Sequence, residues 1–81
     1  MTQTTYYVVQ PFEMTRAGRL IASTAMAAQT GPQAVRMAER QAAGKAGAVA
    51  FSRTGDPETG DFDDAVMLGM FGQVPEDLTA S

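Results

Sequence analysis

Among the side chains that could bind a metal ion or act in catalysis, carboxylates form the densest group, between residues 56 and 64. Ca²⁺ and Mg²⁺ prefer carboxylate oxygens as ligands. The spacing departs from an EF-hand loop, because the glycine comes one position early and no Glu closes the loop. Nothing on an exposed turn would raise a carboxyl pKa for acid–base catalysis either. We therefore expect a solvated turn, and the alternative is a weak cation site formed by Asp56, Glu58, Asp61 and Asp63.

Other catalytic groups are scarce in this chain. There is no His, Cys or Trp, which removes imidazole bases, thiolate nucleophiles and the commonest zinc ligands. Ser23, Thr24 and Ser52 have no evident base beside them, and Lys45 follows a predicted helix without an apolar pocket around it. We predict a protein that is not an enzyme, with no catalytic residue and no cofactor.

Charge is divided along the chain, although the net charge is only −3. All basic residues lie within residues 1–53, and the charged residues of the segment 54–81 are all acidic. A nucleic-acid surface would need the basic side chains to gather near Tyr6 and Tyr7, and the isoelectric point of 4.6 argues against it. The division instead suits an acidic part that meets basic residues of the same chain or of a second copy. The basic candidates are Arg16, Arg19, Arg36, Arg40 and Lys45.

The chain of 81 residues has room for one domain. No run approaches the roughly 20 apolar residues of a membrane-spanning helix. The first residues lack the basic and apolar parts of a signal peptide, so we expect a cytoplasmic protein without membrane contact. We assign residues 1–74 to a single domain and residues 75–81 to a flexible tail.

Two strands and a turn are predicted before the helix. Residues 5–14 are rich in aromatic and β-branched types, which favours a strand. A turn over residues 15–18 would place Gly18 at its left-handed position. Residues 19–26 then return as a second strand, although their alanines also allow a helix, and the register of this hairpin stays open.

The helix has the clearest signals in the sequence. Thr30 is a good N-cap, Pro32 fits the first turn, and Gln33 completes a capping box. Gly44 or Gly47 would end it. Its apolar arc is mostly alanine, so the helix can approach a sheet closely. The arc consists of Ala34, Val35, Met37, Ala38 and Ala42.

A second hairpin is predicted around residues 57–60, with Asp56 opposite Asp61. That register pairs Phe51 with Val66, Val49 with Leu68, and Arg53 with Asp64. The larger apolar residues on one face are then the expected core, namely Val49, Phe51, Phe62, Val66, Leu68 and Met70. The opposite face would carry Ala50, Ala65, Met67 and Phe71.

These elements predict an α+β fold of order β-β-α-β-β, an antiparallel four-stranded sheet with one helix packed on one face. One helix covers one face, so the other presents an apolar surface of the kind monomers usually bury. We therefore expect a homodimer whose interface contains Ala50, Ala65, Met67 and Phe71. The function that follows is a non-catalytic protein–protein interaction module, and the alternative is a weak ligand- or cation-binding protein.

A resemblance covers most of the chain. It is carried by residues 48–60 (Ala-Val-Ala-Phe-Ser-Arg-Thr-Gly-Asp-Pro-Glu-Thr-Gly), residues 61–68 (Asp-Phe-Asp-Asp-Ala-Val-Met-Leu), residues 10–13 and residues 18–20. With these segments the chain resembles small uncharacterised single-domain proteins of proteobacteria, a family with no assigned activity. The resemblance implies one small α+β domain and transfers no functional residue.

Overall fold

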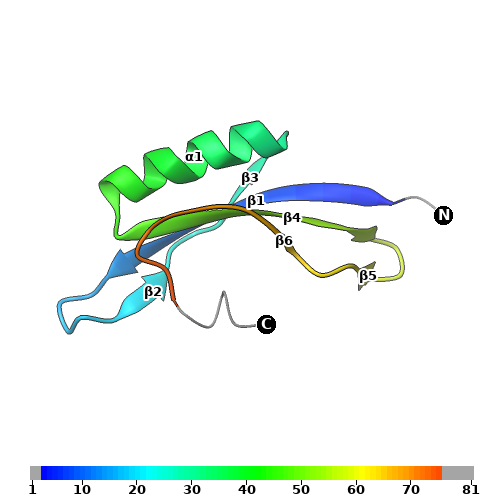
Figure 1. Cartoon of the computed structure of the whole chain (residues 1–81). Coiled ribbons are helices and arrows are strands. Elements are labelled where there is room, and N and C mark those ends of the chain that lie inside the picture. The colour runs from blue at the N-terminus through cyan, green and yellow to red at the C-terminus, as the bar shows by residue number, and fades with distance from the viewer. Residues whose placement is uncertain (1–2, 76–81) are drawn as a thin grey trace.

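The chain folds as one antiparallel sheet with a helix on one of its faces (Figure 1). The computed structural model describes residues 3–75. The predicted α+β class with a single helix is confirmed for these residues. The elements in chain order are β1 (Thr4–Met14), β2 (Leu20–Ala22), β3 (Met26–Ala28), α1 (Gly31–Gly44), β4 (Gly47–Asp56), β5 (Asp61–Phe62) and β6 (Val66–Gly72).

The sheet has six strands, so the predicted count of four is wrong. The central pair is β1 and β4; β2 and β3 share one edge of β1, and β5 and β6 share one edge of β4. Each outer strand is broken where its register shifts. Phe12 pairs with Ala22 of β2, whereas Val8 pairs with Ala27 of β3, which is a slip of one residue. A slip of one residue moves side chains to the other face, and the chain accommodates it with an unpaired segment.

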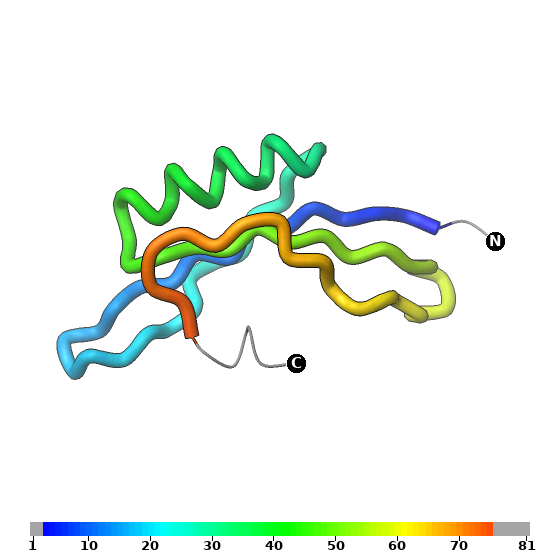
Figure 2. Tube along the Cα trace, in the orientation of Figure 1, coloured from blue at the N-terminus to red at the C-terminus, as the bar shows by residue number. Residues whose placement is uncertain are grey.

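The central strands are longer than the helix that packs on them. β1 has 11 residues and α1 has 14, so their lengths are about 37 Å and about 21 Å at the usual rise per residue. The β1–β2 turn and the β4–β5 turn therefore project beyond opposite ends of α1 (Figures 1 and 2). The molecule is elongated, with extents of 46 × 23 × 19 Å.

The predicted start of the helix is confirmed. The backbone N–H of Gln33 donates to Oγ1 of Thr30 at 3.1 Å, and Thr30 has extended backbone angles. The side chain of Gln33 accepts from the backbone N–H of Gln29 at 2.7 Å, one residue earlier than in a standard capping box. Both predicted turns also form, with positive φ angles of 84° at Gly18 and 78° at Gly60.

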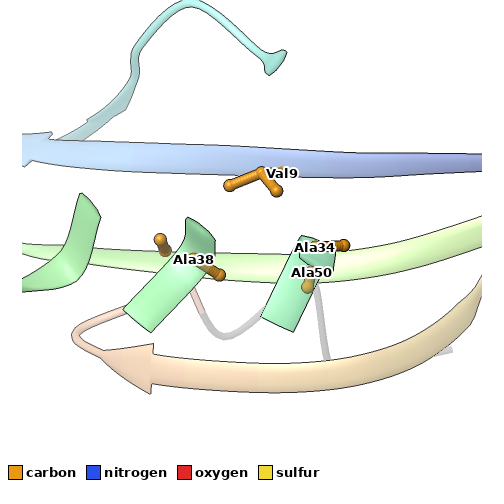
Figure 3. Packing of buried hydrophobic residues seen from close by; sticks show 5 residues of the cluster. Val9, Ala34, Ala38 and Ala50 are labelled. Atoms are coloured by element: carbon orange, nitrogen blue, oxygen red, sulfur yellow. The ribbon is translucent and has the colours of Figure 1, made fainter. Parts of the chain in front are cut away.

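The core is built from small side chains between α1 and the sheet. Ala34 and Ala38 of the helix meet Val9 of β1 and Ala50 of β4, all fully buried (Figure 3). Short side chains on both layers allow close approach, and larger residues such as Leu68 and Phe71 pack around this contact. The helix covers the face with Ala48 and Ala50, so the prediction that it packs on the face with Val49 and Phe51 is wrong. Two residues of the predicted core are confirmed, because Val49 is 1% exposed and Leu68 packs against the core.

The predicted pairing of β4 holds at the turn and fails beyond it. Asp56 lies opposite Asp61 as expected. Further along, Phe51 lies opposite Met67 and Val49 opposite Met70, with a register shift between Ala50 and Phe51. The predicted pairs Phe51–Val66 and Val49–Leu68 are therefore wrong. Arg53 lies between the segment of β4 that pairs with β5 and the segment that pairs with β6, so the pair Arg53–Asp64 stays a prediction. Of the residues assigned to the core, Val66 is 59% exposed and Met70 47% exposed.

Candidate functional site

The acidic turn between β4 and β5 surrounds a shallow hollow. Asp56, Asp61 and Asp63 line it together with Thr59 and Phe62, and its volume is about 480 Å³. Oδ1 of Asp56 accepts from the backbone N–H of Glu58 at 2.9 Å, so this carboxylate stabilises the turn itself. Within residues 3–75, no three acidic side chains converge in a way that could hold a metal ion. The geometry gives the cation alternative no further support.

A polar cluster joins three elements near the C-terminal end of α1. Oγ of Ser23 donates to Oε2 of Glu13 at 2.9 Å, and Nζ of Lys45 lies 3.3 Å from Oε1 of Glu13. The hydrogen bond from Ser23, followed by the hydrogen bond and charge of Lys45, lowers the pKa of Glu13. A carboxylate with a lowered pKa is a weaker base than an ordinary glutamate.

Arg53 is the cross-strand partner of Tyr6, but the five basic residues named as candidates lie elsewhere. Tyr7 packs against the core from the helix face, whereas Tyr6 is 43% exposed on the opposite side. The ring of Tyr6 lies 6.0 Å from the ring of Phe62, and the guanidinium carbon of Arg53 lies 5.4 Å from the centroid of Phe62. The five basic candidates occupy the β1–β2 turn, the exposed side of α1, and the ion pair with Glu13. The described residues thus form no continuous basic and aromatic surface for a nucleic acid.

The sheet face opposite α1 carries an apolar groove beside β6. Its volume is about 250 Å³. Figure 1 shows α1 on one side of the sheet. Within residues 3–75, no helix lies on this face. The groove is lined by Gln10, Val49, Phe51, Ala65 and Met67.

The four residues predicted at the interface lie in two different environments. Ala65 is exposed and Met67 is 40% exposed, and both line the groove on the uncovered face. Ala50 is fully buried beneath α1, and Phe71 packs against the core on the same side. The prediction that all four share the uncovered face is therefore wrong for Ala50 and Phe71, because β4 presents its alanines to the helix.

Strand β6 carries an exposed apolar surface, although Val66 and Met70 were predicted to lie in the core and Met67 alone was predicted at the interface. Val66, Met67 and Met70 are 59%, 40% and 47% exposed, so half of the large exposed hydrophobic residues of residues 3–75 lie on this one strand. The strand contains no charged residue. A run of seven residues without charge and with Gly69 at its centre was the available signal, and it could equally have indicated a buried strand.

No protein-family model, curated protein or solved structure matches this chain. No homologue therefore assigns a role to any of its residues. The helical part of residues 3–75 lacks the length and apolar character needed to cross a membrane.

Proposed function

We propose that this protein is a small cytoplasmic, non-catalytic interaction module that associates with a second copy of itself through β6 and the adjoining groove. The observation that carries the proposal is the concentration of exposed apolar side chains on one uncharged strand. Monomeric proteins rarely leave such side chains together in water. The lack of cysteine supports the cytoplasmic location, because small domains of oxidising compartments commonly depend on disulfides.

The groove adds a second contact to the same surface. Met67 belongs both to β6 and to the groove, and the half-buried Phe51 lies opposite it in the sheet. A methionine side chain adapts its shape to the surface that it meets. A second copy that covers β6 would therefore also remove part of the groove from water.

Charge supports association between two copies of this chain. The acidic turn and the β1–β2 turn, which contains Arg16 and Arg19, lie at opposite ends of the elongated molecule (Figure 2). A two-fold arrangement allows the acidic end of each copy to approach the basic end of the other, and each contact then occurs twice. We expect the dimer to weaken as salt concentration rises.

Sedimentation equilibrium of the wild-type chain tests the proposal, with Met67→Asp as the interface variant. Ala25→Asp is the control, because it adds the same charge at an exposed position between β2 and β3, at the other edge of the sheet and outside both charged turns. We expect dimers for the wild type and Ala25→Asp, and monomers for Met67→Asp at the same concentration. A wild-type mass of one chain at millimolar concentration and low salt would contradict the proposal. Phe71→Asp is unsuitable, because Phe71 packs against the core.

A further inference from the structure

Strand β6 pairs with β4 along one of its two hydrogen-bonding edges. No other strand of residues 3–75 pairs with its second edge. At the end of β6, the backbone N–H of Gln73 donates to the carbonyl of Ala46 at 3.0 Å. The hydrogen-bonding direction alternates along an antiparallel strand, so Phe71 and Gly69 also direct their backbone groups towards β4. The backbone N–H and C=O of Met70 therefore point away from the sheet.

The two edges of the sheet differ in length. The edge formed by β2 and β3 consists of three-residue strands separated by residues 23–25. Short, interrupted edge strands prevent pairing with another chain. β6 has seven residues and contains neither a charge nor a proline. Its irregularity lies opposite Ala50 and Phe51, and the register from Gly69 to Gly72 is regular.

The charge at each end of β6 favours one direction of pairing. Val66 lies opposite Ser52, towards the acidic turn, and Gly72 lies opposite Gly47, towards the turn with Arg16 and Arg19. Parallel pairing of two β6 strands would bring two acidic ends together. Antiparallel pairing places each acidic end beside the basic end of the partner, which removes this repulsion.

We propose that two copies pair their β6 strands antiparallel about a two-fold axis and so form one continuous sheet. This inference rests on the proposed self-association and specifies its geometry. The pairing satisfies the outward backbone groups of Met70 in both copies. It also brings Met67 and Met70 of each copy together on one face and the partly buried Leu68 and Phe71 together on the other.

Amide hydrogen exchange of the wild-type chain, followed by NMR, gives the first test. In a β6-paired dimer the amide of Met70 exchanges slowly at high protein concentration and faster as the protein is diluted and the dimer dissociates. The amide of Phe71 is the internal control, because it faces β4 in the monomer. A dimer in which the Met70 amide exchanges freely at every concentration would overturn edge pairing and leave self-association standing.

Met70→Pro gives the second test, with Met70→Leu as the control. Proline removes the outward N–H of residue 70, and the bonds between β6 and β4 do not use that group. We expect Met70→Pro to weaken the dimer by about ten-fold or more and Met70→Leu to retain it. Circular dichroism shows whether Met70→Pro folds, and if it does not, the exchange measurement on the wild type decides.

Three further outcomes complete the test. A monomeric wild type at millimolar concentration and low salt overturns both the self-association and the edge pairing. A folded Met70→Pro variant that dimerises like Met70→Leu overturns edge pairing alone. A mass above two chains contradicts a closed two-fold contact through one strand.

Discussion

The ammonium group of Lys45 lies 3.3 Å from Oε1 of Glu13, which joins the segment after α1 to the end of β1. Oγ of Ser23 donates to the other carboxylate oxygen at 2.9 Å, so Glu13 also contacts the segment between β2 and β3. This carboxylate thus connects the segment after α1 with the edge of the sheet that β2 and β3 form. The hydrogen bond from Ser23, and then Lys45, lowers the pKa of Glu13.

A lowered pKa in the folded state makes stability depend on pH. The contribution of Glu13 is complete above the pKa of an unfolded Glu, and it is lost as the pH falls through the lowered pKa of the folded state. We expect urea unfolding at several acidic pH values to show a smaller loss of stability for Glu13→Gln than for the wild type. Ser23→Ala should reduce the dependence in part. Identical pH profiles for the three proteins would contradict this role of Glu13.

The cap at Thr30 should contribute measurably to stability. Thr30→Ala removes the oxygen that accepts from the N–H of Gln33, and such losses cost about 0.5–2 kcal/mol. Chemical denaturation measures the difference. Thr30→Ser keeps the hydroxyl and should lie close to the wild type, so an equal loss in both variants would show that the hydroxyl is not responsible.

Ala50 tests which face of the sheet the helix covers. Ala50 is fully buried against Ala34 and Ala38, so the added atoms of Ala50→Leu have no space and should cost about 1–3 kcal/mol. Ala43→Leu is the control, because Ala43 lies on α1 and its side chain is exposed. Denaturation curves in urea give both values. Equal, small effects of the two substitutions would mean that Ala50 does not face the helix.

Arg53 tests the register of the second hairpin. Its guanidinium carbon lies 5.4 Å from the ring centroid of Phe62, an arrangement worth about 0.5–1 kcal/mol at exposed sites. A double-mutant cycle of Arg53→Ala and Phe62→Leu should therefore show coupling. The cycle of Arg53→Ala with Asp64→Ala should be additive, and strong coupling there would instead support the direct pairing of Arg53 with Asp64.

Local signals in the sequence were sufficient for the turns and the start of the helix. Thr30, Gly18 and Gly60 act through neighbours only a few residues away, and the structure confirms each of them, while the side chain of Gln33 bonds Gln29 in place of Thr30. The opposition of Asp56 and Asp61 follows from the length of the turn between them, and it is also confirmed. These features depend on backbone geometry within a few residues, which a single sequence contains.

The face that α1 covers was decided by packing in three dimensions. Side-chain size favours Val49 and Phe51 as the core, because larger apolar residues gain more from burial. The helix nevertheless packs on Ala48 and Ala50, where small side chains allow it to approach closely while Leu68 and Phe71 fill the periphery. This choice depends on how two surfaces fit together, and hydrophobicity along the chain does not contain that information.

The candidate interface also combines features that the sequence contains with features that only the folded structure decides. The absence of charge from β6 can be read directly from the sequence, and so can the separation of acidic from basic residues along the chain. The pairing with β4 slips by one residue between β5 and β6 and again opposite Ala50 and Phe51. The two slips together decide which residues of β6 face the helix, and Met67 and Met70 are left exposed. A shift of one residue exchanges the two faces of a strand, and only the pairing of β6 with β4 in the folded chain determines where it occurs.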